Sequence, residues 1–470
     1  MPEPRERQTI DVRSERAVVA AVRLPGSIFD PQEPFGEITE LARQAGAIVV
    51  GEMSQNRDRP EAGTYMGRGK LAELRDLCEA LDARTIIFDH ELAPKQIAKI
   101  EEITERKVID RSELILDIFA GRATTHEAKL QVELAQLNYT YPRLRAMWSH
   151  LERIVGAGGI GGVGTRGPGE QQIEIDRRLV QRRRVQLERE LEGIRERKSR
   201  SVRERNRGHF TVGLVGYTNA GKSTLFNTLT AGGAYADDRL FATLVTRTRA
   251  WDLGGGEEVM ISDTVGFVRE LPHHLIASFR ATLEEATHAD LLLVVLDVSD
   301  RTSELMFETV NHTLDELFEE VTRIEGDDWT PPERVLLLNK ADQLTDNREL
   351  LVWQSRVPDA IPICSLPDDE GLPRIGGTAL TQRVRTAAAG PTERYRIRLP
   401  MSAGKTMHEL ETKGVVLDRA YAGNTATVTV EIGSRLLERL RIATPGLELL
   451  DHTDEVQPEK RPAWRGVEPA

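Results

Sequence analysis

One eight-residue string, GYTNAGKS at residues 216–223, constrains the fold of this chain more than any other segment. It follows an apolar, β-rich run at residues 210–215 and precedes a helical pattern that begins at Ser223. A glycine-rich turn between a strand and a helix lets backbone N–H groups surround phosphate oxygens, and the helix N-terminus adds positive potential. In this pattern Lys222 reaches the outer phosphates, and the Ser223 hydroxyl binds Mg²⁺. The string therefore predicts a phosphate site at a strand end of an α/β sheet.

A second string, DTVG at residues 263–266, follows the strand-like run EVMISD at 258–263. Asp263 can hold the metal through water, and the N–H of Gly266 can contact the last phosphate, so this string predicts a phosphate sensor. A threonine between the two strings is needed to complete the Mg²⁺ shell, and we select Thr243, with Thr246 as the alternative. The predicted metal ligands are therefore Ser223 and Thr243.

The third string, NKAD at residues 339–342, follows the apolar run RVLLL at 334–338 and identifies the base. A carboxylate accepts two hydrogen bonds from adjacent N–H groups of guanine, for which adenine has no matching pair. Because leaving a buried carboxylate unpaired is costly, such a site rejects the wrong base by roughly 10⁴ or more. We therefore expect Asp342 to select GTP over ATP. Asn339 is expected to tie this loop to the phosphate loop, and residues 365–367 to offer an N–H to guanine O6.

Each string alone could be a polar loop, but three in this order, each after a predicted strand, favour a GTP site. The predicted nucleotide-binding residues are Gly216, Tyr217, Thr218, Asn219, Ala220, Gly221, Lys222, Ser223, Thr224, Phe241, Ala242, Thr243, Leu244, Val245, Asp263, Thr264, Val265, Gly266, Asn339, Lys340, Ala341, Asp342, Ser365, Leu366 and Pro367.

The hydrophobic pattern divides the chain into segments of different character. We expect a disordered N-terminus at 1–16, a small α/β domain at 17–122, a helical hairpin with a glycine-rich loop at 123–206, a nucleotide domain at 207–390, a small α+β domain at 391–457 and a tail at 458–470. In the nucleotide domain, strands are expected near Phe210, Thr248, Val259, Leu291, Val335 and Ile361. The first hairpin helix is expected to be interrupted at Pro142. The fold class is α/β, with a P-loop domain between these smaller parts.

With these motifs the chain resembles the HflX family of ribosome-associated GTPases, a translation-factor-related class of P-loop GTPases. The likeness continues upstream through YMGRGK at 65–70, VIDRSELILDIFA at 108–120, AKLQVELAQL at 128–137 and GTRGPGEQQIEIDRR at 164–178. Thr243 matches the metal-binding threonine of the family pattern, whereas Val245 replaces a common aspartate and Leu366 a usual alanine. The resemblance implies a GTPase that associates with the large (50S) ribosomal subunit, in splitting or rescue of stalled ribosomes or in subunit biogenesis.

The residue after Gly266 bears on the rate of hydrolysis. Small GTPases place there a glutamine that orients the attacking water, and this chain has Phe267, which can neither donate nor accept a hydrogen bond. We therefore expect slow intrinsic hydrolysis that a partner stimulates, with no certain catalytic residue in the chain itself. The alternative role of Phe267 is to pack the segment against the core.

Asn219 suggests a second cation. In several GTPases of this class, an asparagine at this point of the phosphate loop helps to hold K⁺ against the phosphates, where the ion supplies the charge of an arginine finger. The alternative is an asparagine chosen because it tolerates the turn. We therefore expect Mg²⁺ as the cofactor and treat K⁺ as a hypothesis.

The positive charge of the chain is concentrated in its second hairpin helix. Residues 177–207 hold thirteen Lys or Arg and five Glu, whereas the whole chain carries a net charge of −12. This pattern favours phosphate contacts with ribosomal RNA, and the candidates are Arg166 in the glycine-rich loop and Arg182, Arg183 and Arg184 on the helix. Intrahelical Glu–Arg pairs on a solvated face are the alternative. The competing function is a GTP-dependent signalling or scaffold switch that binds a protein through this helix.

Composition places few further limits on the chain. With 470 residues, 39% hydrophobic and 29% charged, it has ample material for several cores. Two distant cysteines, Cys78 and Cys364, and no signal peptide fit a reducing cytoplasm, with both thiols as small buried hydrophobes. The apolar run at 291–296 is too short to span a bilayer. We expect a cytoplasmic monomer, with peripheral membrane association left open.

Overall fold

The structure is a computed structural model that describes residues 15–25, 32–156, 168–230, 246–269, 285–326, 329–369 and 371–453. Its contacts divide the chain into two compact units. The first holds residues 1–207, 211–251 and 260–376, and the second holds 208–210, 252–259 and 377–470. The domain boundaries expected from the sequence stay predictions.

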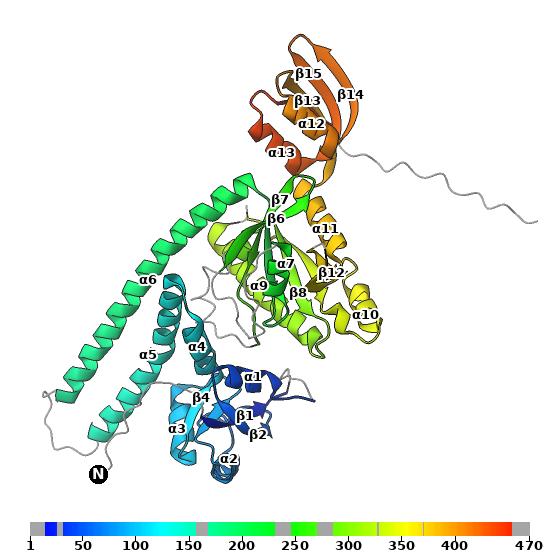
Figure 1. The fold of residues 1–470 in the computed structure, drawn as a ribbon. Helices are drawn as coiled ribbons and strands as arrows, with labels where there is room; N and C mark the ends of the chain where they lie inside the picture. Colours follow the sequence, from blue (N-terminus) through cyan, green and yellow to red (C-terminus); the bar gives the residue numbers. More distant parts are fainter. Residues whose placement is uncertain are drawn as a thin grey trace, which may run out of the picture. The chain divides into compact units, whose positions relative to one another are not determined.

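The N-terminal part of the first unit is a four-stranded parallel sheet in the order β2-β1-β3-β4 (Figure 1). Its strands are β1 (Arg16–Arg23), β2 (Ile48–Asn56), β3 (Thr85–Phe88) and β4 (Lys107–Asp110). Its helices are α1 (Gly36–Gln44), α2 (Arg68–Ala80), α3 (Pro94–Thr104) and α4 (Arg111–Arg122). The α/β domain expected in this region is therefore present.

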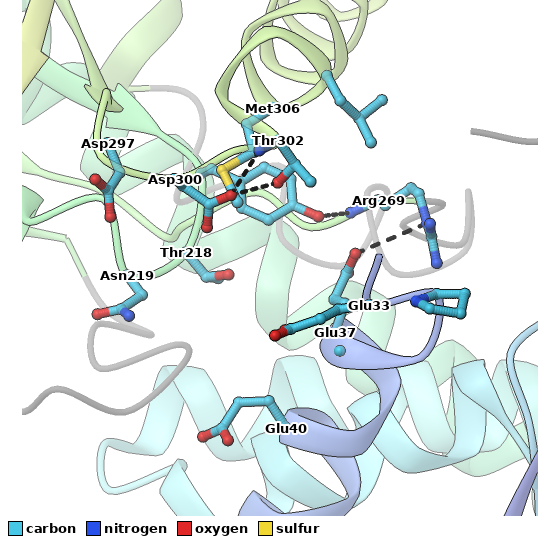
Figure 2. Close-up of a pocket in the computed structure, with 14 residues that line it drawn as sticks. Glu33, Glu37, Glu40, Thr218, Asn219, Arg269, Asp297, Asp300, Thr302 and Met306 are labelled. Atoms are coloured by element: carbon cyan, nitrogen blue, oxygen red, sulfur yellow. Dashed lines mark hydrogen bonds and ion pairs between the residues drawn. The ribbon is translucent and has the colours of Figure 1, made fainter. Parts of the chain in front are cut away.

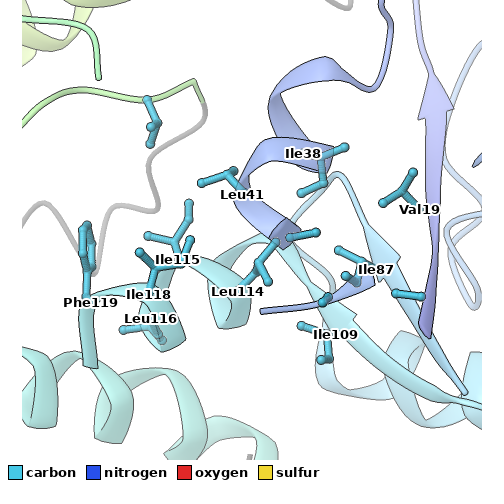
Figure 3. Packing of buried hydrophobic residues seen from close by; sticks show 14 of the residues in the cluster. Val19, Ile38, Leu41, Ile87, Ile109, Leu114, Ile115, Leu116, Ile118 and Phe119 are labelled. Carbon is cyan, nitrogen blue, oxygen red and sulfur yellow. The ribbon is translucent and has the colours of Figure 1, made fainter. Parts of the chain in front are cut away.

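Strand β1 is apolar along nearly its whole length because helices cover both faces of the sheet. Val19 belongs to the cluster that α1 and α4 close, while Val18 belongs to the cluster that α2 and α3 close. Figure 3 shows Ile38 and Leu41 of α1 in the first cluster, together with side chains of α4. A continuous apolar strand, rather than an alternating one, is typical of a parallel sheet buried on both sides.

Two long helices follow, α5 (His126–Gly156) and α6 (Pro168–Gly208). Their described side chains meet along a leucine seam, with Leu130 and Leu134 of α5 against Leu187 and Leu191 of α6. The expected interruption at Pro142 was wrong, because α5 continues through this residue. A proline inside a helix removes one backbone hydrogen bond and crowds the preceding turn, so other contacts must hold the helix together there.

Asp110 supplies such contacts on both sides of the proline. Its buried carboxylate caps α4 by accepting from Glu113 N (2.9 Å), and it also accepts from Tyr139 Oη (2.7 Å) and Arg143 Nη2 (2.6 Å). Burial, and then the charge of Asp110, raises the pKa of Tyr139, so its hydroxyl stays protonated and donates. Because Tyr139 and Arg143 flank Pro142, this anchor keeps α5 in one piece.

The second sheet has six strands in the order β10-β9-β8-β5-β7-β6. The strands are β5 (Thr211–Gly216), β6 (Arg247–Gly254), β7 (Glu257–Asp263), β8 (Leu291–Asp297), β9 (Glu333–Asn339) and β10 (Ile361–Pro362). From β10 to β7 neighbouring strands are parallel, so their carboxyl ends meet at one edge. Gly216, Asp263 and Asn339 end three of these strands, and ligands bind at such an edge. The expected α/β fold is confirmed.

The C-terminal residues of the second unit form a four-stranded antiparallel sheet in the order β14-β15-β13-β16, after α11 (Gly377–Ala389). The chain runs β13 (Thr392–Pro400), α12 (Gly404–Lys413), β14 (Val415–Ala422), β15 (Thr425–Gly433), α13 (Ser434–Ala443) and β16 (Glu448–Thr453). This connectivity is a split βαβ unit. The alternation of β13 and β15 places Ile397 and Val428 in the core with Leu410 and Leu440 of the two helices.

Two expectations from composition can be compared with the structure. Cys78 and Cys364 are both free and buried. Within the described ranges, no helix is both long enough and apolar enough to cross a membrane.

Candidate functional site

The phosphate loop lies between β5 and α7 (Lys222–Leu229), and its backbone demands glycine at both ends. Gly216 has φ +151°, and a Cβ there would lie 2.2 Å from Val295 O. Gly221 has φ +95°, and a Cβ there would lie 2.2 Å from Asn339 Nδ2. Side chains at these positions would force the loop away from its neighbours, so the motif glycines are explained by close packing.

Lys222 folds back over the loop. Its side chain is 6% exposed, and Nζ donates to Gly216 O (3.1 Å) and Tyr217 O (2.7 Å). Burial lowers the pKa of Lys222 to about 8, while the nearby Asp263 charge acts in the opposite direction. Phosphate oxygens would offer this ammonium group anionic acceptors in place of two neutral carbonyls. The arrangement therefore suits a lysine that turns toward a bound triphosphate.

The oxygen groups expected around Mg²⁺ meet beside the loop. Ser223 Oγ donates to Asp263 Oδ2 at 2.8 Å, which joins the first turn of α7 to the end of β7. A hydroxyl and a carboxylate are hard oxygen donors, and Mg²⁺ typically takes one or two such groups together with substrate phosphates and waters. The residues present therefore fit Mg²⁺. The other predicted ligand, Thr243, lies outside the described residues, as do Phe241, Ala242, Leu244 and Val245.

Asn339 joins three loops through one buried side chain, which is 1% exposed. Its Nδ2 donates to Ala220 O of the phosphate loop at 2.7 Å. Its Oδ1 accepts from Ser365 N (3.0 Å) and Ser365 Oγ (2.7 Å). The expected tie between the NKAD string and the phosphate loop is therefore present, and the same amide extends it to residue 365.

The groups predicted to select the base lie on the exposed side of this junction. Asp342 is exposed in a short 3-10 turn, η1 (Ala341–Gln343). Lys340 has φ +59° and its Nζ lies 2.5 Å from Asp297 Oδ2, so its stem is held along the loop. Of residues 365–367, proline has no N–H and Ser365 N is already bonded to Asn339. Leu366 is therefore the remaining candidate for the contact with guanine O6.

Phe267 lies in the core and not in the site. It is 2% exposed and belongs to the same apolar cluster as Tyr217 and Val294. Its backbone is paired with the phosphate loop, since Thr218 N donates to Phe267 O (2.8 Å) and Phe267 N donates to Gly216 O (3.1 Å). The packing role weighed for Phe267 is thus present, and its ring offers no hydrogen bond to a water molecule.

A cluster of charges that sequence reasoning missed joins Arg269, two residues after Phe267, to the N-terminal sheet. Arg269 Nη2 donates to Asp89 Oδ2 (3.0 Å). Its Nε also lies 3.7 Å from Glu37 Oε2, and Figure 2 shows these two side chains paired. Arg111, which is 1% exposed, donates from Nη1 to Asp89 Oδ1 (2.6 Å), from Nε to Arg269 O (3.2 Å) and also pairs with Glu37. Arg269 N in turn donates to Tyr217 Oη at 2.8 Å. The phosphate loop and the DTVG segment are therefore coupled to the N-terminal part.

Apolar contacts accompany these charges. Val265 and Val268 belong to the cluster of the N-terminal sheet that also contains Ile38 and Leu114. The sequence contained one indication that this part of the chain has a special role. Arg111 and Leu114 lie in the string at 108–120 that carries the family resemblance.

A cavity of about 230 Å³ lies beside the phosphate loop, lined by Thr218 and Asn219 and by the start of α9 (Ser303–Glu325) (Figure 2). Carboxylates dominate its polar lining, among them Glu40 and Asp300. Such a lining repels phosphates, so this cavity is not the triphosphate site.

The predicted site residues thus reach one place from distant parts of the chain. The strings at 216–224, 263–266, 339–342 and 365–367 meet at the carboxyl edge of the second sheet and the loops around it. Of the predicted RNA contacts, Arg182, Arg183 and Arg184 lie on α6, while Arg166 is outside the described residues.

We predict that Phe267→Gln will not produce a fast GTPase. The new amide would be buried in the apolar cluster, so the variant should lose roughly 3–5 kcal/mol of stability, as for a large core truncation. Thermal unfolding and single-turnover GTP hydrolysis would measure both effects. Phe318→Gln, in the same cluster on α9, is the matched control and should lose stability similarly. A tenfold faster rate in Phe267→Gln alone would show that this side chain faces the nucleotide.

Comparison with known proteins agrees with this geometry. Three family models match successive segments, described as GTP-binding GTPase N-terminal (32–120), GTP-binding GTPase middle region (122–205) and 50S ribosome-binding GTPase (211–340). GTPase HflX of Magnetococcus marinus is 39% identical over 431 residues, which cover 91% of this chain and 94% of the relative. GTPase HflX of Escherichia coli is 36% identical over 434 residues, which cover 89% and 94%.

A GTP-binding protein from Sulfolobus solfataricus in complex with GDP matches with a TM-score of 0.39 and 23% identity, covering 79% of this chain and 98% of that one. The sequence relatives are similar over most of both chains, and the motifs that bind and hydrolyse GTP are in place. The chain belongs to the HflX family of GTPases.

Proposed function

We propose that this GTPase binds the large ribosomal subunit in its GTP-bound form and leaves after hydrolysis, in splitting or rescue of stalled ribosomes or in subunit biogenesis. The observation that carries the proposal is the match of residues 211–340 to a 50S ribosome-binding GTPase model, in a chain of the HflX family. Mg²⁺ would be held by Ser223 and Thr243, and Asp342 would select guanine.

The contact between Arg269 and the N-terminal part supports a nucleotide-dependent switch. The segment after the DxxG glycine is one that the last phosphate orders and hydrolysis releases in GTPases. Here that segment is bonded to Asp89 and Arg111. A change at the phosphates therefore has a physical route to the N-terminal sheet and, through Asp110 and Tyr139, to α5.

The positive charge of α6 supports an RNA partner, but one of the predicted arginine contacts is better explained by the hairpin itself. Arg183 donates from Nε and Nη2 to both carboxylate oxygens of Glu133 at 2.7 Å, and this bond lowers the pKa of Glu133. Arg184 lies 3.5 Å from Glu188, whereas Arg182 is exposed. Arg183 is thus a hairpin contact, and Arg182 is the better candidate to meet a phosphate.

The alternative is a signalling or scaffold switch that binds a protein through α6. The pair between Arg184 and Glu188 is the observation that favours it, because mixed charge on a helix face is typical of solvated or protein-contacting surfaces. The two functions differ in how binding depends on salt.

Co-sedimentation with purified large subunits distinguishes the two functions. We expect binding with a non-hydrolysable GTP analogue and its loss with GDP. The affinity should fall steeply between 50 and 300 mM salt. For each phosphate contact, the decimal logarithm of the association constant should fall by about 0.7–0.9 for each tenfold rise in salt concentration. Arg182→Glu should weaken binding and reduce this slope by about one contact.

Matched variants separate RNA contact from damage to the hairpin. The exchange Glu133→Arg with Arg183→Glu keeps the ion pair and should bind as the parent chain does. Arg439→Glu changes an exposed residue of α13 in the second unit, and it should not change binding to large subunits. Equal binding in the GDP form would count against a nucleotide-dependent switch of either kind. Binding that ignores salt would count against an RNA partner and for the protein-binding alternative.

We also propose that K⁺ assists hydrolysis through Asn219, which is exposed and lines the edge of the phosphate loop. Its φ of +62° also suits an asparagine that serves the turn, and the dependence of hydrolysis on the cation distinguishes the two roles. Hydrolysis should be at least several-fold faster in KCl than in matched NaCl, and Asn219→Ala should abolish the difference. Equal rates in the two salts would rule the ion out.

A further inference from the structure

The end of β8 carries a carboxylate that the three GTP strings do not include. Asp297 is the last residue of β8, and in the register of the parallel sheet it stands opposite Asn339, the last residue of β9. It is 8% exposed. Val298 N donates to Asn339 O (3.0 Å), so the two strand ends stay adjacent where the chain leaves the sheet. Asp297 therefore lies next to the start of the NKAD loop.

The two oxygens of this carboxylate have different partners. Oδ1 accepts from the backbone N–H of Ser299 (3.0 Å) and from its hydroxyl (2.6 Å). Oδ2 lies 2.5 Å from Lys340 Nζ. Because the two donors of Ser299 fix Oδ1, the carboxylate is oriented and Oδ2 is held for the ammonium group. The pair is largely shielded from water, since the side chains of Asp297 and Lys340 are 12% and 25% exposed.

The backbone of Lys340 makes this contact possible. Its φ of +59° is the left-handed conformation, which is uncommon for residues other than glycine. After this turn the side chain reaches from the end of β9 to the end of β8, and neighbouring strands lie about 4.8 Å apart. The methylene stem of Lys340 is therefore held at both ends, by the backbone at one and by Asp297 at the other.

We infer that Asp297 is a positioning residue for nucleotide binding, which holds the stem of Lys340 extended so that the face of the base can pack on it. The inference rests on the proposed guanine site, in which Lys340 belongs to the NKAD string. The methylene groups of a lysine can cover an apolar surface while its charged head is satisfied elsewhere. A stem that is already held loses less conformational freedom on binding than a free one. The simpler role is an ion pair that only stabilises the turn after β8.

The test measures the dissociation constants of GDP and of inosine diphosphate, whose base lacks the 2-amino group of guanine, for Asp297→Asn. The amide oxygen can replace Oδ1 as the acceptor for Ser299, whereas the amide nitrogen cannot accept from an ammonium group. The variant thus keeps the turn and removes the ion pair. Both dissociation constants should rise by about threefold to tenfold, as expected for immobilising one long side chain on binding. Because the two bases share the ring face that the stem contacts, the preference for GDP should stay unchanged.

Asp300→Asn is the matched control. Asp300 has the same local pattern, since it accepts from Thr302 N (2.8 Å) and Thr302 Oγ1 (2.7 Å). It also lines the same cavity beside the phosphate loop as Asp297 (Figure 2). This variant removes the same charge from the same cavity and leaves the ion pair with Lys340 in place, so both dissociation constants should stay unchanged. An equal loss of affinity in Asp300→Asn would assign the effect to charge alone and overturn the inference.

A reciprocal variant identifies the route of the effect. Lys340→Met keeps a long apolar side chain but has no ammonium group, so it should weaken both nucleotides by the same factor as Asp297→Asn. The double variant should bind no more weakly than either single variant, because both changes release the same anchor. Losses that multiply in the double variant, or a fall in the preference for GDP, would overturn the inference. Unchanged affinity with a lower melting temperature in Asp297→Asn would leave the ion pair with a role in folding only.

Failure of the underlying site gives a different result. Lys340→Ala removes the stem itself. If this variant leaves both dissociation constants unchanged, the stem does not contact the base, and the guanine site is misplaced. If Lys340→Ala weakens both nucleotides and Asp297→Asn weakens neither, the base site stands and only the role of Asp297 is wrong.

Discussion

The nucleotide site depends on one buried amide. Asn339 ends β9, and its side chain uses both of its functions, donating to Ala220 O and accepting from the N–H and hydroxyl of Ser365. No charged or purely apolar side chain of this size could bond in both directions. Because Gly221 has no side chain, the amide can approach the phosphate loop closely enough to bond. Three loops from separate parts of the sequence are thereby fixed as one surface, and we propose that Asp342 and Lys222 bind opposite ends of the same nucleotide there.

The packing of Phe267 explains why we expect efficient hydrolysis to require a partner. Phe267 stands where small GTPases have glutamine, and its ring is part of the core beneath the phosphate loop. The segment is attached instead to the N-terminal part of the chain. Val265 and Val268 pack into the N-terminal cluster, and Arg269 is bonded to Asp89. A segment held in this way is suited to transmit the state of the phosphates to other parts of the chain. It is poorly suited to orient water by itself.

The places of the three strings in the second sheet could be predicted from the sequence, because each string follows an apolar run of strand length. Gly216, Ser223 and Asp342 could be assigned from spacing and preceding strands alone, and the strands of the second sheet lie where the apolar runs are. The cluster of Arg111, Asp89 and Glu37 could not be predicted, since its members are charged residues far apart in the chain and nothing in a local pattern pairs them. Strand β14 was missed because most of its residues are exposed, which removes the alternation that reveals a half-buried strand. The helix break predicted at Pro142 was wrong because the prediction considered only the local effect of a proline. Asp110, which lies outside α5, bonds to Tyr139 and Arg143 on either side of Pro142.

We propose that this chain binds GTP unaided but hydrolyses it efficiently only on its partner. The most direct measurement is the single-turnover rate of GTP hydrolysis by the full chain, alone and with increasing amounts of purified large or small ribosomal subunits. We expect a slow rate alone, a rise of at least tenfold that saturates with large subunits, and little change with small subunits. A fast rate for the chain alone, or no response to large subunits at saturating GTP, would show that hydrolysis does not depend on this partner.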